Sequence, residues 1–464
     1  MRSIVWFRND LRVTDNPALV EACARGEVTA VTCLCPAQLR AHDVGPMRIA
    51  FLLRSLGVLS HDLASIGVSL KIIERPRFAD LPEALVDFAR QEGATHLEFN
   101  DEYPLDERRR DAEVADACAA AGIVVGRHVA DCTLSPGTVL TNSGSPYTVF
   151  SPFRRRWLER VDRAQLTPMD APRRRPGKGA GDPVPVTLDG VGAGLGEDLW
   201  PAGEAAAQKA LKRFLSGPVL DYGDTRDSPA LDATSRLSPY LAIGAISVNQ
   251  CLHAAVEANG GRLDGRSEGI SKWITELIWR EFYRHIVALF PHVSQGKSFR
   301  RELDALEWRD APEDYEAWKA GETGYPLVDA AMRQLNETGW MHNRLRMVTA
   351  MFLTKHLLLD WRLGERYFME KLVDGDFASN NGGWQWSAST GTDAAPYFRI
   401  LNPTTQGQRF DADGAFTRRM LPVLADVPDK WLFEPKRFDA DLGYPDPIVE
   451  HRAARARALA LFKN

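Results

Sequence analysis

The sequence predicts a two-part fold, with an N-terminal α/β domain built on a doubly wound parallel sheet of five strands and an all-α C-terminal domain. Three observations predict it. Short apolar runs alternate with amphipathic segments up to about residue 130, prolines and glycines crowd residues 165–200, and helical periodicity dominates from Glu204 onward. We therefore expect an α/β domain over residues 1–130, an interdomain linker over residues 131–203 and a helical domain over residues 204–464.

The elements of the first domain alternate strictly between strand and helix. In chain order we expect a strand at 3–7, a helix at 16–25, a strand at 28–35, a helix at 47–66, a strand at 68–74, a helix at 81–92, a strand at 95–100, a helix at 106–121 and a strand at 123–129. Strands separated by helices pair in parallel, which gives a Rossmann-like sheet whose ligands bind beyond the carboxyl ends of the strands. No G-x-G-x-x-G follows the first strand, so we do not expect a dinucleotide in the usual Rossmann position.

Composition excludes several classes of protein. A hydrophobic content of 44% and a charged content of 26% are those of an ordinary globular protein, and the net charge of −5 means that any DNA binding must use a local basic patch. The six cysteines lack metal-ligand spacing and fit a reducing cytosol. An arginine at position 2 argues against a signal peptide, and no apolar run is long enough to span a membrane. We expect a cytoplasmic protein with no membrane partner.

Tryptophan is concentrated in the helical half. Eight of the twelve tryptophans lie between Trp273 and Trp386, and the last thirteen residues of that span also contain two aspartates, two asparagines and three glycines. Indole is a broad stacking surface and is easily oxidised, which suits a site that moves electrons and holds a flat ring. Core filling is the alternative for any single tryptophan.

Three polar motifs accompany the tryptophans. Tyr222, Arg226 and residues 234–238 bring hydroxyl and amide groups to a helix start, marked by Ser238 before a proline, where they could bind phosphate or simply cap the helix. In the helix at 273–285, Glu276 and Arg280 are four residues apart and fit either an exposed ion pair or a carboxylate that lines a cavity.

The third motif pairs residues 339–347 with the aspartate-rich stretch. Asn343 and Arg346 fall within one helical turn, and Arg346 could neutralise Asp374 across a cavity. Asp374 and Asp376 have no third hard ligand nearby, so we expect no metal site.

Together these segments resemble a known family. Residues 273–285, 321–347 and 374–406, the opening Val5-Trp-Phe-Arg-Asn-Asp-Leu-Arg12 and the closing Gly443-Tyr-Pro-Asp-Pro-Ile-Val-Glu450 resemble the DNA photolyase/cryptochrome family, and within it the bacterial class I cyclobutane pyrimidine dimer photolyases. The resemblance covers essentially the whole chain. It implies an antenna-chromophore domain at the N-terminus and a helical domain that binds FAD and the DNA lesion.

The resemblance implies a set of cofactor-binding residues. Carried over, FAD, active in its reduced form, contacts Tyr222, Thr234, Ser235, Arg236, Leu237, Ser238, Trp273, Glu276, Arg280, Asn343, Arg346, Asp374, Asp376 and Asn380. Asp374 and Asp376 would face the polar edge of the isoalloxazine, and Asn380 would sit opposite its N5. Gly382 and Gly383 would let the backbone approach the ligand closely.

The implied reaction is light-driven electron transfer from excited reduced flavin to a pyrimidine dimer flipped out of single- or double-stranded DNA. Carried over, the lesion and its flanking DNA contact Arg226, Glu276, Trp279, Asn343, Arg344, Met347, Trp386 and Arg399, with Glu276 on the carbonyl edge of the dimer and the two tryptophans as stacking walls. Trp384, Trp361 and Trp308 match the family's chain of indoles from the flavin to the surface. With Glu276 and Asn380, they are the residues that we expect to act in catalysis.

Two alternatives have different functions. Photolyases for (6-4) lesions place histidines where Asn343 and Met347 stand, and many cryptochromes replace the residue that matches Asn380, so a cyclobutane substrate is favoured over a cryptochrome-like blue-light sensor without repair activity. A nucleotide-binding module with a helical appendage would contain no flavin at all.

The resemblance also implies an antenna pigment between the domains. His42 and Glu107 match the folate-type pattern, whereas Asp106, Ser294 and Gln295 depart from it. We expect 5,10-methenyltetrahydrofolate, with a deazaflavin as the alternative, and an exposed His42 without a ligand is an equally simple interpretation of that residue. A monomer is expected.

Overall fold

The N-terminal domain contains the predicted sheet. The computed structural model describes residues 1–174, 181–439 and 441–462. Five parallel strands, in the order β3-β2-β1-β4-β5, are β1 Arg2–Phe7, β2 Glu27–Leu34, β3 Ser69–Glu74, β4 His96–Asn100 and β5 Val124–His128. The expected α/β fold is confirmed, and each strand end lies within one residue of its predicted position. The strand order reverses between β1 and β4, so ligands are favoured beyond the ends of these two strands.

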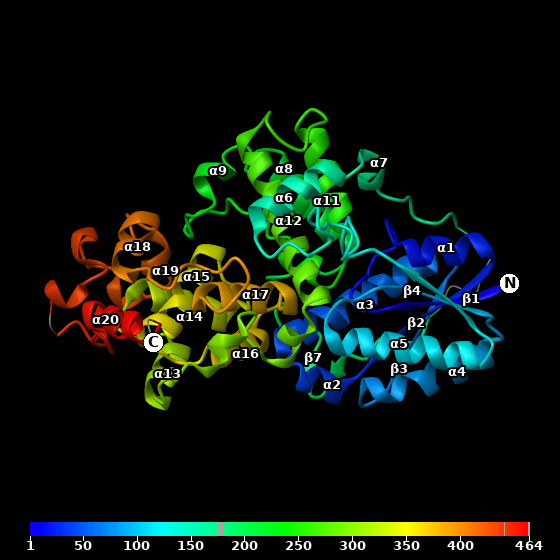
Figure 1. Ribbon diagram of the computed structural model, residues 1–464, viewed down its shortest axis with the longest axis horizontal. Coiled ribbons are helices and arrows are strands. Elements are labelled where there is room, and N and C mark those ends of the chain that lie inside the picture. The colour runs from blue at the N-terminus through cyan, green and yellow to red at the C-terminus, as the bar shows by residue number, and fades with distance from the viewer. Residues whose placement is uncertain (175–180, 440, 463–464) are drawn as a thin grey trace.

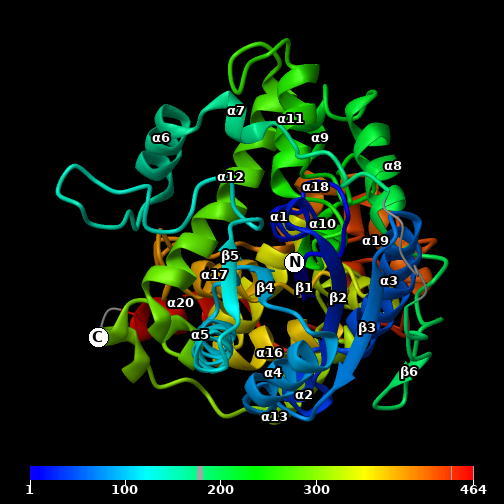
Figure 2. The same cartoon turned by 90° about the vertical axis from the view of Figure 1, so that its right-hand side faces the viewer.

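Helices cover both faces of the sheet (Figures 1 and 2). They are α1 Pro17–Arg25, α2 Pro36–Ala41, α3 Pro46–Ser65, α4 Leu81–Glu92 and α5 Leu105–Ala120. The period-two pattern of β1 divides its side chains between two cores, with Val5 and Phe7 on one face and Ile4 and Trp6 on the other. The short helix α2, which begins at a proline directly after β2, was not predicted from the sequence.

The segment that we expected to be a linker is partly folded. It contains α6 Phe150–Arg160, α7 Arg163–Leu166 and a small hairpin of β6 Thr187–Leu188 and β7 Val191–Gly192. Phe153 and Trp157 of α6 are fully buried, and α6 packs against the long helix α12, Glu268–Leu289. Residues 150–160 of the expected linker are therefore helical, because three aromatic side chains give them a buried face. Residues 175–180 lie outside the described residues, and the three-part division of the chain stays a prediction.

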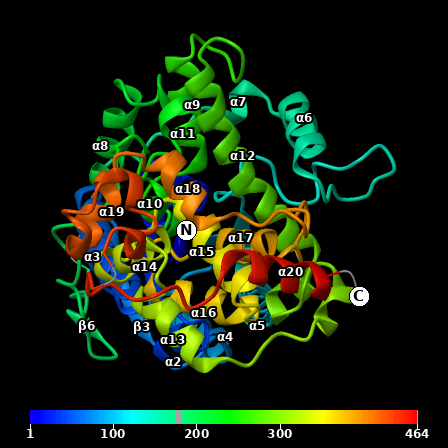
Figure 3. The same ribbon diagram turned by 90° about the vertical axis from the view of Figure 1, so that its left-hand side faces the viewer.

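The second domain is helical, as expected, and α12 runs through it (Figures 1 and 3). Its remaining helices are α8 Glu204–Leu215, α9 Tyr222–Thr225, α10 Ser238–Ala242, α11 Val248–Ala258, α13 Pro312–Ala320, α14 Pro326–Thr338, α15 Asn343–Met351, α16 Trp361–Lys371, α17 Phe377–Ala388, α18 Pro403–Phe410, α19 Ala415–Met420 and α20 His451–Leu461. In the part of the chain that the structure describes, no helix combines the length and the apolar character needed to cross a membrane.

The two domains meet closely behind the carboxyl end of β1. Gly244 has a left-handed φ of 66°, and a Cβ added there would lie 2.1 Å from the carbonyl oxygen of Asn9. The backbone amide of Leu11 also donates to the Ile243 carbonyl at 3.1 Å. A side chain at position 244 would therefore force the domains apart.

Candidate active site and interdomain cavity

Two aspartates precede α17 and are both held by arginines. Arg346 on α15 reaches Asp374 at 2.8 Å, which is the pair that the sequence predicted. Asp376 is the N-cap of α17, where its Oδ2 accepts from the Ser379 amide at 3.0 Å, and Arg284 of α12 lies 3.0 Å from its other oxygen. Burial alone would raise the pKa of Asp376, but Arg284 and Arg280 outweigh it and hold that pKa far below its usual value.

Arg280 faces the N-terminal domain. Its guanidinium donates to the side chain of Asp131, just after β5, and Arg284 donates to the other oxygen of the same carboxylate. Arg280 therefore does not pair with Glu276, although the two are one helical turn apart. This chain of charges from Asp131 through Arg284 to Asp376 connects the sheet to α17, and the sequence did not reveal it because its members are far apart in the chain.

Glu276 instead pairs with Arg226 at 2.7 Å. Close by, Arg344 pairs with Asp227, also at 2.7 Å. The loop from α9 is thus tied to α12 and α15 through two of the residues that we expected at the DNA-binding surface. Asn343, at the start of α15, is exposed, whereas Met347 is half-buried one turn later.

The loop before α10 brings the expected hydroxyl groups together. Ser235 Oγ accepts from the Leu237 amide at 3.4 Å, and the indole of Trp340 donates to Ser238 Oγ, also at 3.4 Å. Arg236, in the left-handed region with φ of 52°, places its guanidinium 5.5 Å from the centre of the Trp340 ring. Ser238 is the first residue of α10 rather than its N-cap, and α10 has only five residues. The helix dipole that we expected to favour an anion is therefore small, so hydroxyl groups and Arg236 provide the polar contacts.

Helix α17 carries Asn380 in a fixed orientation. The Asn380 Nδ2 donates to the backbone oxygen of Glu365 on α16 at 2.9 Å, which leaves its Oδ1 as the free acceptor. The Glu365 side chain in turn accepts from Asn381 at 2.9 Å, and burial raises the pKa of Glu365 to about 7.

The two glycines of α17 have different surroundings. A Cβ on Gly382 would lie 2.3 Å from the ring of Tyr283, so this glycine permits close packing of α12 against α17. A Cβ on Gly383 would meet nothing within 4 Å. Close approach of the backbone to a ligand is therefore compatible with the open space at Gly383 only, because Tyr283 fills the space at Gly382.

The three indoles that match the electron-transfer chain differ in exposure. Trp361 is fully buried and Trp384 is 2% exposed, whereas Trp308 is half-buried next to Phe462, with 6.3 Å between ring centroids. The ring of Trp384 also contacts Trp318, with centroids 6.0 Å apart, a tryptophan that we did not assign to the site. Trp308 is thus more exposed than Trp384 and Trp361, as expected for the last indole on a path from the flavin to the surface.

The expected stacking residues lie on α12 and α17. Trp279 stacks on Phe150 of α6 with 3.6 Å between ring centroids and an interplanar angle of 10°. Trp386 is half-buried, and its backbone oxygen accepts from the Ala395 amide at 3.1 Å. Phe150 covers one face of Trp279, so only the other face can stack on a base.

Trp273 is buried against Phe214, and Tyr222 is buried beside the same ring. Arg399 lies exposed on the loop that follows α17.

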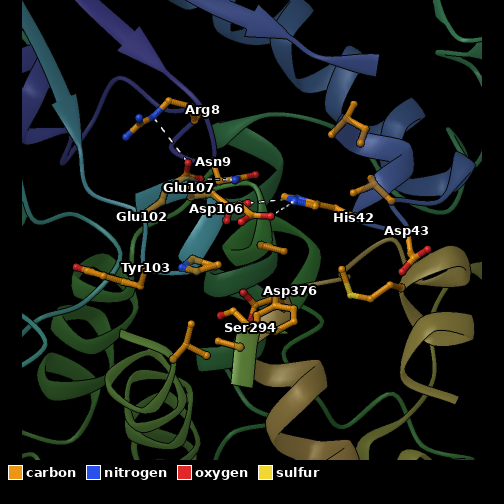
Figure 4. A pocket seen from close by; sticks show the side chains of 18 of the residues that line it. Arg8, Asn9, His42, Asp43, Glu102, Tyr103, Asp106, Glu107, Ser294 and Asp376 are labelled. Carbon is orange, nitrogen blue, oxygen red and sulfur yellow. Dashed lines mark hydrogen bonds and ion pairs between the residues drawn. The ribbon is translucent and has the colours of Figure 1, made fainter. Parts of the chain in front are cut away.

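A cavity of about 460 Å³ lies between the domains, at the ends of β1 and β4 where the topology favours a ligand (Figure 4). His42, Asp106 and Glu107 approach it from the N-terminal domain, and Ser294 and Asp376 from the helical domain. The His42 ring lies 3.3 Å from Asp106 and 3.4 Å from Glu107. Burial would lower the pKa of His42, but the two carboxylates outweigh it and raise that pKa.

Arg48 of α3 is the least satisfied charge in this cavity. Among the described residues it forms no ion pair, and its hydrogen bond to Asn9 Oδ1 is long, at 3.4 Å. The buried hydroxyl of Ser294 has no hydrogen-bond partner there either. A guanidinium without an ion pair and a hydroxyl without a hydrogen-bond partner suit a ligand that carries an anionic group and a polar edge.

Glu102, also at the cavity wall, gives a prediction about acid stability. Burial would raise its pKa, but Arg110, at 2.5 Å, and Arg8 outweigh burial and lower the pKa from 4.5 to about 2. Because the folded-state pKa is the lower one, the contribution of Glu102 to stability is complete above about pH 4.5 and is lost as the pH falls toward about 2, a change of about 3 kcal/mol. We expect Glu102→Gln to flatten the dependence of the urea midpoint on pH between about pH 5 and 3. Glu83→Gln, at an exposed position of α4, is the control. If the urea midpoint of Glu102→Gln falls with decreasing pH as steeply as that of the wild type, the lowered pKa of Glu102 is contradicted.

Sequence comparisons identify the family. A profile described as DNA photolyase matches residues 3–173, and one described as the FAD binding domain of DNA photolyase matches residues 273–464. The chain is 45% identical to a deoxyribodipyrimidine photo-lyase of Salmonella typhimurium, over 99% of this chain and 98% of that protein. This chain belongs to the DNA photolyase family.

Solved structures agree with the comparison of sequences. A class III photolyase from Agrobacterium tumefaciens has a TM-score of 0.89 and 36% identity over 100% of this chain and 97% of its own. A cryptochrome from Synechocystis has a TM-score of 0.87 and 26% identity, covering 99% of both chains. Repair enzymes and cryptochromes thus share this fold, and function must be argued from the site. The described residues contain no group of three or more histidine, cysteine, aspartate or glutamate side chains placed to hold a metal ion.

Proposed function

We propose that the protein is a deoxyribodipyrimidine photo-lyase that splits cyclobutane pyrimidine dimers in DNA under light. The observation that carries the proposal is that a single helix, α17, holds several of the residues that this reaction needs. Within twelve residues this helix carries Asn380 with a free acceptor oxygen, Gly383 facing open space, the buried Trp384 and the half-buried Trp386. One rigid element therefore supplies groups for a flavin edge, an electron donor and a stacking surface for a base.

The residues present fit FAD. The hydroxyls of Thr234, Ser235 and Ser238 suit its phosphates, and Arg346 with Asp374 suits the polar edge of its ring system. When bound and reduced, FAD supplies the electron that light sends to the dimer. Asn380 is held by Glu365 so that its oxygen can accept a hydrogen bond from N5 of the reduced ring. Because Arg284 keeps Asp376 ionised, the charge of this one aspartate stays constant across the physiological pH range.

We propose that the lesion site consists of Glu276, Trp279, Asn343, Met347 and Trp386. The free face of Trp279 and the ring of Trp386 stack on the flipped-out dimer, and the Glu276 carboxylate accepts a hydrogen bond from the N–H group on its carbonyl edge. Arg226, which pairs with Glu276, keeps that side chain oriented until the dimer enters. No general acid or base has to move a proton for the ring to split, which is consistent with a site built mainly from stacking surfaces and fixed charges.

Illumination of the purified, reduced protein with an oligonucleotide that contains one thymine dimer tests the function. Loss of the dimer under blue light and none in the dark is the expected result. A flavin-containing protein that leaves dimers intact under light would favour a cryptochrome-like sensor. A colourless preparation, purified in the dark and releasing no flavin on denaturation, would favour a nucleotide-binding module. We expect repair to be carried out by a monomer in the cytoplasm, associated with the nucleoid through DNA.

We further propose that the interdomain cavity holds the antenna pigment. His42, Asp106 and Glu107 offer a paired donor and acceptors for a pterin ring, and Arg48 offers a partner for an anionic tail, as 5,10-methenyltetrahydrofolate requires. A deazaflavin with an anionic side chain would use the same arginine. The absorption spectrum of the native protein distinguishes the two pigments from each other and from the flavin.

Glu107→Ala gives a prediction about pigment binding. We expect the variant to retain its FAD and to lose at least about 10-fold in affinity for the second pigment, because a hydrogen bond to a charged group at a buried ring is worth about 1.5–3 kcal/mol. The measurement is the ratio of each pigment to protein after denaturation. Glu113→Ala, on the exposed side of the same helix α5, should keep both pigments. Unchanged pigment content in Glu107→Ala would remove this residue from the antenna site.

A further inference from the structure

Helix α6 combines a buried aromatic face with a strongly basic outer face. Phe150, Phe153 and Trp157 point into the core, while four arginines, Arg154, Arg155, Arg156 and Arg160, lie among the remaining positions. Between residues 132 and 160 the sequence contains these four arginines and one glutamate, which gives a net charge of +3 in a chain whose total is −5. The packing of α6 requires only the aromatic residues, so it does not account for the charge.

Two of the four arginines have no carboxylate partner. Arg154 pairs with Asp264 at 2.7 Å, and Arg156 pairs with Glu159 at 3.1 Å. Arg155 and Arg160 are exposed and form no ion pair with any residue that the structure describes. Arg160 donates to the backbone oxygen of Thr138 at 2.7 Å, which orients its side chain without neutralising it. The outer face of α6 therefore keeps at least two free positive charges.

The position of α6 connects this face to the proposed lesion site. Its first residue, Phe150, is the ring that stacks on Trp279. The Phe150 amide donates to Asp393 at 3.1 Å, and Thr392 donates to the Thr148 carbonyl at 2.7 Å, so the start of α6 is joined to the loop that carries Arg399. Figure 3 shows α6 on one side of α12, with α17 near the other end of that helix.

The length of α6 matches a run of phosphates. At 1.5 Å per residue, Arg155 and Arg160 lie about 8 and 15 Å along the helix from Phe150. A strand of B-DNA advances about 3.4 Å per nucleotide, so these distances correspond to roughly two to four nucleotides from the stacked base. Phosphates at that distance would belong to the strand that flanks the dimer.

We propose that the outer face of α6, Arg155 and Arg160 in particular, is a DNA-contact surface that binds backbone phosphates flanking the lesion. The proposal rests on the proposed function, because it places the dimer against Trp279. The occupant is DNA rather than an acidic protein, since the helix that carries these arginines begins at the ring stacked on Trp279 and is joined to the loop that carries Arg399. The face contributes affinity and orientation but no reacting group.

Salt dependence of binding tests the proposal. The double variant Arg155→Ala/Arg160→Ala should bind dimer-containing duplex about 10-fold more weakly and lower the slope of log K against log salt by about two, because each phosphate that the protein neutralises adds about 0.9 to that slope. Repair of a dimer in a free dinucleotide, which is too short to reach α6, should stay at the wild-type rate, and FAD content should not change. Arg155→Lys/Arg160→Lys should retain most of the slope, because the charges remain.

Arg75→Ala/Arg90→Ala, which removes two exposed arginines from the N-terminal domain, is the matched control for net charge. The proposal would be overturned if Arg155→Ala/Arg160→Ala showed the same salt slope and the same affinity for DNA as this control. It would also be overturned if the double variant were stable and contained FAD but lost repair of the dinucleotide as strongly as binding of the duplex. A wild-type protein that repairs no dimer at all would instead contradict the proposed function. The two failures are thus distinguishable.

Discussion

We expect replacement of Trp308 by phenylalanine to slow the light-driven re-reduction of oxidised flavin at least about 10-fold and to leave repair by enzyme that is already reduced unchanged. Phenylalanine is much harder to oxidise than tryptophan, so the variant cannot accept the positive charge that must reach the surface. Trp308 is the half-buried member of the series, whereas Trp361 and Trp384 are buried. Of these three indoles, Trp308 is the one that we expect an external reductant to reach.

Two measurements on the same preparation separate the roles. Photoreduction is followed by the loss of flavin absorption under blue light with an external thiol, and repair is measured after chemical reduction in the dark. Trp431→Phe is the control, because Trp431 is also half-buried but is not one of the three indoles assigned to electron transfer. This variant should behave as the wild type in both assays. Trp318→Phe asks whether the contact of that ring with Trp384 provides a second route. Equal losses of photoreduction and repair in Trp308→Phe would mean that this residue supports the fold rather than the electron path.

The strands of the first domain were predictable because their signal is local. Each strand is a short apolar run bounded by turns. In β1, Ile4, Val5, Trp6 and Phe7 are all apolar because the sheet is buried on both faces and successive side chains enter opposite cores. Helix α6 was missed because the prolines and glycines after it suggested one long irregular segment. Its signal was nevertheless present as apolar residues at positions 150, 153 and 157, the spacing of one helix face.

The site was predictable only in part, for a reason that its ion pairs make clear. The pair of Arg346 and Asp374, which the sequence predicted, is confirmed. The partners of the other charged residues could not be predicted from the sequence. Glu276 and Arg280 have the spacing of an i, i+4 pair, and yet Glu276 binds Arg226 and Arg280 binds Asp131. Those partners lie 50 and 149 residues away in the chain. Short spacing favours a pair by a few tenths of a kcal/mol only, so tertiary contacts decide.

Replacing Arg284 by methionine should lower the free energy of unfolding by about 3 kcal/mol, the low end of the usual cost of breaking a buried ion pair, because both carboxylates are partly exposed. The guanidinium is 5% exposed and joins Asp131 to Asp376, so its loss separates the sheet from the N-terminus of α17. Asp131 keeps Arg280, and Asp376 keeps the Ser379 amide, which limits the loss. The urea midpoint in the dark measures the change. Arg301→Met, which breaks an exposed pair with Asp304, should cost less than about 1 kcal/mol.

The same substitution also changes the response to acid, which separates lost charge pairing from lost packing. In the wild type the pKa of Asp376 is held below its ordinary value of 3.8, so its stabilising contribution is present above about pH 4 and is lost as the pH falls below that value. Without Arg284 the pKa of Asp376 rises, and this part of the acid sensitivity should disappear. Arg284→Met/Asp376→Asn should recover part of the lost stability, because no buried charge is then left alone. If the double variant is as unstable as the sum of the two single changes, the charges are independent, and α17 is held to the sheet by contacts other than this one.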